Sequence, residues 1–216
     1  MEAEQAIFTS LERDGRSGYH LAARSPGLQE AEAVALAAWS PSHGALLLDE
    51  ANQSSLNFHP LPGGRLALAR TCQGPAEYSG RGGRQLYTHA LILDPRWLPS
   101  EGAGPFDLYR DAMSRGCFRY RPNPPAILEP IPLARVFRPA SPERWSPRAR
   151  ELGVPDPDLI RNRLLAGRDV VLRYSGNRIE LAECLLGFIE SGASPISFST
   201  SLRPSPTRPY LLSLVD

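Results

Sequence analysis

The sequence predicts an α+β fold with mixed, mostly antiparallel sheets, a few packed helices and a proline-rich connector between two subdomains. Three observations support this prediction. The chain has 22 prolines and 18 glycines, nearly a fifth of its residues, which favours short elements joined by explicit turns. Several short runs alternate apolar and polar residues between turn dipeptides, as antiparallel hairpins do. Strands and helices alternate irregularly, unlike the regular order of a doubly wound parallel sheet.

The first forty residues are predicted to form a hairpin followed by a helix. Residues 5–10 and 19–24 are the two strands, because the Asp14-Gly15 pair between them is a strong turn signal. Good helix formers follow in the segment 25–39, where Ser25 fits the N-cap and a proline occupies the first helical position.

The middle of the chain is predicted to contribute three strands and a helix. Residues 55–71 indicate a strand, a Pro-Gly-Gly turn and a second strand. In that second strand Leu66, Leu68 and Arg70 share one face, and Ala67, Ala69 and Thr71 share the other. The β-favouring run 85–93 is predicted to be a central strand that ends at an Asp-Pro pair. Residues 105–116 have apolar side chains near helical spacing and a final glycine, which predicts a short helix.

Eight prolines lie between residues 122 and 147, and this density argues against a regular helix or a central strand there. We therefore expect an N-terminal α+β domain over residues 1–121, a proline-rich connector over 122–147 and a small α+β domain over 148–216. The last part is predicted to contain two helices, 156–169 and 177–192, and three strands, 169–176, 195–201 and 209–216.

Composition excludes several classes of function. All 24 basic residues are arginine, so the chain has neither a P-loop lysine nor a Schiff-base lysine. The formal net charge is +1, so no global field attracts nucleic acid or anionic lipid, and we expect neither nucleic acid nor a membrane as partner. The N-terminus lacks the basic and apolar regions of a secretory leader, and no stretch approaches the length of a membrane span. These features predict a cytoplasmic protein.

The cysteines and histidines predict no metal site. Cys72, Cys117 and Cys184 are odd in number and far apart, which argues against both a disulfide framework and a zinc site. The four histidines show no ligand spacing that would complete a metal motif. We expect no metal and no cofactor.

A glycine-rich stretch, SGRGGRQ at residues 79–85, is the first candidate site. Converging backbone N–H groups in such loops can hold a phosphate, and Arg81 and Arg84 could add bidentate donors to a phosphate or carboxylate. The stretch leads into a predicted strand, however, so the helix N-terminus of a typical phosphate site is absent. The alternative interpretation is a surface turn with solvated arginines.

Two more pairs of residues could extend that site. Tyr87 and His89 share one face of the predicted central strand, and a histidine beside a tyrosine could act as an acid or base. The commoner interpretation is a packing histidine in the core. Tyr19 and His20, from the first hairpin, could complete an anion pocket with the glycine–arginine stretch.

No catalytic motif is complete. The string FSTS at residues 198–201 resembles the central motif of arginine-specific ADP-ribosyltransferases, which also need a later Glu-x-Glu. Only fifteen residues follow Ser201 and none is glutamate, so a sheet strand is the better interpretation. The chain has no Gly-x-Ser-x-Gly nucleophile elbow either. The sequence therefore leans towards a protein that is not an enzyme.

Three segments resemble the bacterial GTPase-associated protein family, specifically its type-2 N-terminal domain followed by its middle domain. They are QAIFTSLERDGRSGYHLAARSPGL near the start, SGRGGRQLYTHALIL in the centre and PISFSTSLRPSPTRPYLL at the end. The family's opening pattern is similar to Phe8-Thr9-Ser10, Gly18-Tyr19 and the run from Ala23 to Leu28. Its central motif is similar to Gly80, Arg81, Gly83, Tyr87 and His89. Arg84 departs from that motif, because asparagine is usual there, and this weakens any site carried over to position 84.

The resemblance implies an adaptor-like module without assigned catalytic residues, found in bacterial systems that include a GTPase and are thought to act in conflicts such as antiphage defence. Two hypotheses follow. In the first, the chain is a non-enzymatic interaction module whose partner is a protein, possibly a GTPase. In the second, it is a nucleotide- or phosphate-binding domain that uses the glycine–arginine loop and the adjacent strand.

Overall fold

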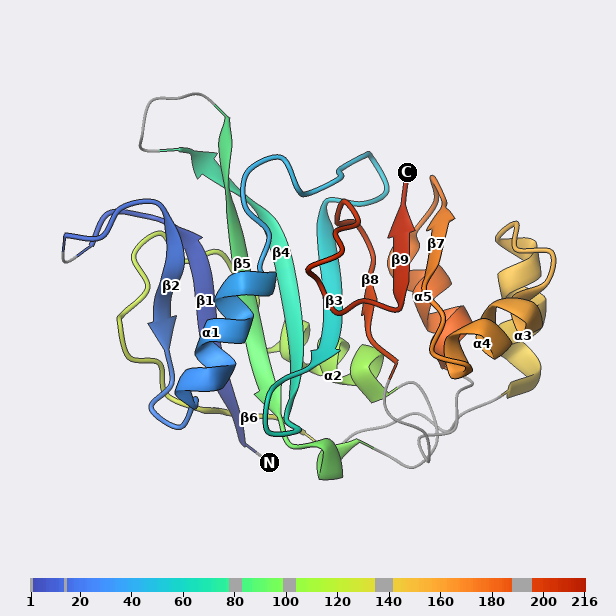
Figure 1. Cartoon of the computed structure of the whole chain (residues 1–216), viewed down its shortest axis with the longest axis horizontal. Coiled ribbons are helices and arrows are strands. Elements are labelled where there is room, and N and C mark those ends of the chain that lie inside the picture. The colour runs from blue at the N-terminus through green and yellow to red at the C-terminus, as the bar shows by residue number, and fades with distance from the viewer. Residues whose placement is uncertain (1, 14, 78–82, 99–103, 135–141, 188–195) are drawn as a thin grey trace.

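A mixed and mostly antiparallel sheet runs through the whole molecule (Figure 1). A computed structural model describes residues 2–13, 15–77, 83–98, 104–134, 142–187 and 196–216. Its main path has the strand order β2-β1-β5-β4-β3-β8-β9-β7, and β6 pairs with β1 off this path. The pairs β7–β9 and β8–β9 are parallel, and the other pairs are antiparallel. The predicted α+β class is confirmed.

The strands are β1 (Glu2–Ser10), β2 (Tyr19–Arg24), β3 (Ser54–Pro60), β4 (Leu66–Ala76), β5 (Arg84–Leu93), β6 (Ile131–Pro132), β7 (Val170–Arg173), β8 (Phe198–Ser199) and β9 (Leu212–Val215). The α-helices in the described part of the chain are α1 (Glu30–Trp39), α2 (Gly104–Ser114), α3 (Pro142–Glu151), α4 (Pro157–Leu165) and α5 (Arg178–Leu186). A short 3-10 turn, Pro95–Trp97, follows β5. No helix among these residues is long and apolar enough to cross a membrane.

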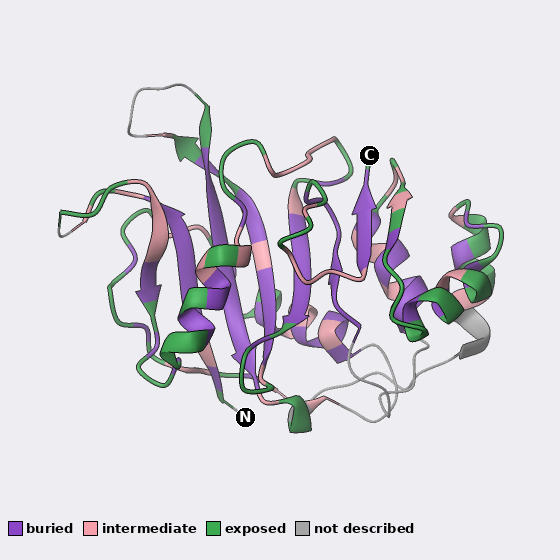
Figure 2. Ribbon diagram, viewed as in Figure 1, coloured by how far each residue is buried: buried purple, intermediate pink, exposed green. Residues whose placement is uncertain are grey.

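The sheet is buried on both faces, and the alternation within β4 shows how (Figure 2). Leu66 and Leu68 pack in the larger core with Phe106 of α2 and with side chains of α3, α4 and α5. Ala67 and Ala69 belong to a second core, beneath α1. Because successive side chains on a strand point to opposite faces, the predicted two-sided pattern of β4 is confirmed.

The predicted hairpins form, with glycines where the backbone must turn. Gly63 and Gly64 have φ angles of 86° and 88°, and they connect β3 to β4. Such positive φ angles carry little steric cost for glycine and a large one for residues with a Cβ. Gly15, with φ of 73°, lies between β1 and β2, whereas its predicted partner Asp14 lies outside the described residues. Strand β1 is longer than expected, since it begins at Glu2.

Helix α1 begins four residues later than the sequence suggested. Ser25 is not its N-cap, because the Ser25 hydroxyl accepts a hydrogen bond from the Gln5 backbone N–H at 2.8 Å. The N-cap is Gln29, which forms a capping box with Glu32. Glu32 is buried, accepts from the Gln29 N–H at 2.9 Å and pairs with Arg65. This reciprocal cap determines where the helix starts.

The proline-rich segment is partly helical, contrary to the prediction. Helix α3 starts at Pro142 and contains Pro147. A proline at the first position costs little because its N–H would be unpaired there, whereas Pro147 removes one bond of the helical ladder. Earlier in the segment the chain is extended, and Ile131 and Pro132 pair with β1. Residues 135–141 lie outside the described part.

The C-terminal elements join the same sheet as the N-terminal ones. Strand β8 pairs with β3 at Phe58 and Phe198, whose rings lie 5.9 Å apart, and β9 and β7 follow. Strand β8 is shorter than the predicted strand 195–201, and α5 ends at Leu186, while residues 188–195 lie outside the described part. The division into two domains and a connector stays a prediction.

Candidate functional site

Tyr87 and His89 lie in the core on the α2 side of the sheet. His89 is fully buried, its Nε2 donates to Gln5 Oε1 at 2.9 Å, and its ring stands edge-on to Phe118 at 5.5 Å. Burial lowers the pKa of His89 to about 3, so the ring is neutral at physiological pH. Tyr87 packs with Ile7, and burial raises the pKa of its hydroxyl. A buried, neutral histidine whose ring is hydrogen-bonded to a glutamine side chain has a packing role.

The glycine–arginine stretch ends in a turn that leads into β5. Arg81 lies outside the described residues. Gly83 has a φ angle of 92°, and its carbonyl accepts from the Glu77 N–H at 3.1 Å, closing the connection between β4 and β5. Arg84 is exposed, and its Nε donates to the Gly74 carbonyl at 2.9 Å. The described part of the stretch is therefore a hairpin end whose arginine contacts backbone.

Tyr19 and His20 lie elsewhere, on β2. The Tyr19 ring stacks on Phe8 with centroids 5.8 Å apart, and its hydroxyl accepts from the Leu86 N–H at 2.9 Å. Burial raises the pKa of Tyr19. His20 Nδ1 lies 2.9 Å from the Gly18 carbonyl, to which it donates a hydrogen bond.

The five predicted residues that the structure describes therefore do not form one site. Ile7 packs with Tyr87, while the neighbouring Phe8 packs with Tyr19. Because neighbouring residues of a strand point to opposite faces, Tyr19 and Tyr87 lie on opposite sides of the sheet.

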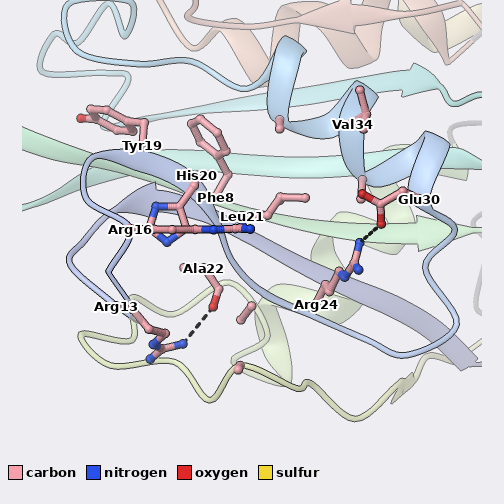
Figure 3. A pocket seen from close by; sticks show the side chains of 14 residues that line it. Phe8, Arg13, Arg16, Tyr19, His20, Leu21, Ala22, Arg24, Glu30 and Val34 are labelled. Atoms are coloured by element: carbon pink, nitrogen blue, oxygen red, sulfur yellow. Dashed lines mark hydrogen bonds and ion pairs between the residues drawn. The ribbon is translucent and has the colours of Figure 1, made fainter.

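A groove with a cavity volume of about 790 Å³ lies beside β2 and α1 and contains two of the predicted residues, Tyr19 and His20 (Figure 3). We call it the arginine groove. Its walls come from β1, the first hairpin, β2, α1 and one residue of the proline-rich segment. Its lining consists of Phe8, Arg13, Arg16, Tyr19, His20, Leu21, Ala22, Ala23, Arg24, Glu30, Ala33, Val34, Ala37 and Ala126.

Three arginines line this groove, and sequence reasoning did not single out any of them. Arg13 donates to the carbonyls of Ala22 at 2.9 Å and Pro124 at 2.6 Å, which fixes its guanidinium between β2 and the proline-rich segment. Arg24 pairs with Glu30 at 2.8 Å, and Arg16 is exposed. A signal was present, because Arg13 and Arg16 flank the predicted Asp-Gly turn and a tight turn brings its flanking residues together.

A bulge in β2 leaves the Ala22 carbonyl available for its hydrogen bond with Arg13. Ile7 pairs with Ala23 and Phe8 pairs with Leu21, so Ala22 has no partner on β1. Bulged residues are free to present backbone groups elsewhere, and the Ala22 carbonyl accepts from Arg13.

The three cysteines and the FSTS hydroxyls are buried away from this groove. Cys72, Cys117 and Cys184 are buried, and burial raises the pKa of each thiol. Two of the FSTS hydroxyls hold the fold together: Thr200 Oγ1 accepts from the Leu56 N–H at 2.9 Å, and Ser201 Oγ accepts from Arg178 at 3.0 Å. Within the described ranges no group of three histidine, cysteine, aspartate or glutamate side chains could hold a metal ion.

Comparison with known protein families places the N-terminal part of the chain in one of them. The family model for the GTPase-associated protein 1 N-terminal domain of type 2 matches residues 2–130. No curated protein and no solved structure matches the chain. The whole lining of the arginine groove, from Phe8 to Ala126, lies within the matched residues.

Proposed function

Because the chain belongs to the family of GTPase-associated protein 1 N-terminal domains of type 2, we propose that it is a non-enzymatic adaptor that binds a GTPase as its protein partner. The family match carries this proposal. It covers more than half of the chain, and the name of the family refers to association with a GTPase rather than to a reaction. The bacterial conflict setting implied by the sequence resemblance is part of the same proposal, as is a cytoplasmic location.

The chemistry of two buried histidines and of the three cysteines supports a binding role. His59 and His89 are buried, and burial lowers their pKa values to about 4 and about 3. A general base needs a pKa near the operating pH and access to its substrate, and these two side chains have neither. The buried cysteine thiols have raised pKa values, which disfavours the nucleophilic thiolate.

The nucleotide- or phosphate-binding alternative needs its residues to face one ligand. Tyr19 and Tyr87 lie on opposite sides of the sheet, and Arg84 contacts the Gly74 carbonyl. We therefore carry the adaptor proposal forward, and a thermal-shift screen over nucleotides and phosphates tests the alternative. A ligand at 100 times its Kd would stabilise the fold by about 2.7 kcal/mol.

The direct test is capture of the partner. The tagged full chain is crosslinked in its native host, retained GTP-binding proteins are identified by mass spectrometry, and each is purified. We expect at least one purified GTPase to bind the purified chain in a calorimetric titration, in its GTP-bound or GDP-bound form. Failure to recover any GTP-binding protein under crosslinking, or failure of every recovered one to bind directly, contradicts the proposal.

A further inference from the structure

The arginine groove concentrates positive charge on a protein that is nearly neutral as a whole. The chain has 24 basic and 23 acidic residues, whereas the groove lining has three arginines and one carboxylate, Glu30. That carboxylate is paired with Arg24 at 2.8 Å, and both side chains are exposed. The charges of Arg13 and Arg16 thus have no carboxylate partner among the described residues.

Arg13 is held in place by neutral groups. Its two described hydrogen bonds go to the carbonyls of Ala22 and Pro124, which order the guanidinium but do not neutralise its charge. A guanidinium has five N–H donors, so further donors remain for an anionic ligand. Arg16 is exposed near the hairpin tip and can move to meet such a ligand. One fixed and one adaptable cation therefore line the same groove.

The groove also has an apolar side. Val34 of α1 is 62% exposed, and Leu21 and Phe8 lie across from it on β2 and β1. The Phe8 ring is fixed by its stack with Tyr19, whose hydroxyl is fixed in turn by the Leu86 N–H. Little side-chain entropy is then lost when an apolar group packs against this surface.

We propose that the arginine groove is the docking site for an extended acidic segment of the protein partner, one that also carries an apolar side chain. This inference rests on the proposed adaptor function and names its contact surface. The segment's carboxylates pair with Arg13 and Arg16, and its apolar side chain packs on Val34 and Leu21. Charge complementarity selects this occupant, because an acidic apolar peptide matches both the cationic and the apolar parts of the lining.

Other anions would contact the arginines of the groove but not its apolar side chains. A free phosphate uses the arginines and leaves Val34 exposed to water. Nucleic acid needs many cations along a phosphate backbone, and the net charge of +1 does not supply them. Both are outcomes of the experiment below.

The probe is a fluorescein-labelled synthetic peptide of alternating glutamate and leucine, compared with a matched peptide that has glutamine in place of every glutamate. Fluorescence anisotropy with the full chain measures each Kd. We expect saturable binding of the glutamate peptide, at least tenfold weaker binding of the glutamine peptide, and a Kd that rises with NaCl because exposed charges are screened.

Two pairs of variants locate the site. Arg16→Glu should weaken binding by about tenfold, whereas Arg168→Glu, the same charge change at an exposed arginine outside the groove, should leave the Kd unchanged. Val34→Ser should weaken binding, whereas Val171→Ser, at a valine 54% exposed on β7, should not. None of these side chains makes a described hydrogen bond or ion pair, and circular dichroism confirms that each variant is folded.

Three results would overturn the inference. One is the absence of saturable binding, and another is an equal loss of binding in both arginine variants. The third is displacement of the peptide by tripolyphosphate or oligothymidylate, which would show a small-anion or nucleic-acid site instead. Failure of this docking site can be told apart from failure of the adaptor function. A GTPase that binds Arg16→Glu and Val34→Ser as tightly as the parent chain disproves the docking site and leaves the adaptor role intact, whereas the absence of any GTPase that binds the parent chain disproves the adaptor role.

Discussion

Replacement of Arg178 by methionine should unfold the protein at a markedly lower denaturant concentration. Arg178 is the first residue of α5 and is 0% exposed. Its Nε donates to the Tyr174 carbonyl at 2.9 Å, and its Nη1 donates to the Leu47 carbonyl at 3.2 Å and to Ser201 Oγ at 3.0 Å. Its Nη2 pairs with Asp49. One guanidinium thus joins the ends of β7 and β8 to the segment before β3.

The size of the effect follows from what methionine leaves behind. Two part-buried carbonyls and one buried hydroxyl lose their donor, at up to about 1–3 kcal/mol for each group that stays unsatisfied. Removal of one partner from a buried ion pair costs about 3–5 kcal/mol, and Asp49, which is 29% exposed, recovers part of this by hydration. We expect a loss of about 3 kcal/mol, or roughly 6–12 °C in Tm for a chain of this length.

The assay is urea unfolding followed by circular dichroism, with Arg148→Met as the matched control. Arg148 pairs with Glu151 and with Glu180 of α5, but its side chain is 47% exposed, so its loss should scarcely move the midpoint. Arg178→Lys should lie between the parent and Arg178→Met, because a lysine keeps the charge without the planar fork. Equal midpoints for Arg178→Met and Arg148→Met would refute the reasoning.

Three further predictions concern stability. Glu32→Ala removes the capping-box carboxylate and the partner of Arg65, so urea unfolding should show a loss of roughly 2–3 kcal/mol; an unchanged midpoint contradicts this. Burial lowers the pKa values of His59 and His89 to about 4 and about 3, so the unfolded chain binds more protons below its histidine pKa of about 6.5, and stability should fall as pH drops from 6.5 towards 4. Urea titrations at pH 7 and pH 5 should differ by roughly 3–4 kcal/mol for the two histidines together, and a flat profile would show that they titrate normally. Gly83→Ala places a Cβ on a residue with φ of 92°, so the free energy of unfolding should fall by about 1–2 kcal/mol. This loss should appear as a lower Tm, and an unaltered Tm would mean that the turn relaxes to accept the side chain.

Much of the fold could be predicted because its signals are local. The alternation in β4 is visible within six residues, and the glycines of the β3–β4 turn stand at the positions that need a positive φ. The start of α1 was mispredicted because two signals competed. Ser25 has the chemistry of an N-cap, but its hydroxyl binds Gln5, twenty residues away, and the buried Glu32 caps the helix instead.

The candidate site was harder to predict than the fold, because it depends on where side chains point. From the sequence, Tyr19 and His20 were grouped with Tyr87 and His89 because all four have polar side chains close in sequence to a glycine-containing turn. The pairing of β1 with both β2 and β5 places Tyr19 and Tyr87 on opposite faces. The fold also places Arg13 and Arg16 beside α1 and Ala126. No short sequence motif predicts that these residues lie together.

The sequence by itself determined the α+β class, the order of the N-terminal strands and turns, and membership of a GTPase-associated family. Only the folded structure shows that β8 pairs with β3 across more than a hundred residues, and that Arg178 contacts both Leu47 and Ser201. It alone decided that three arginines share one groove. The physical reason is the range of the interactions: backbone preference and alternation act over a few residues, whereas sheet pairing and groove formation depend on which distant surfaces are buried together.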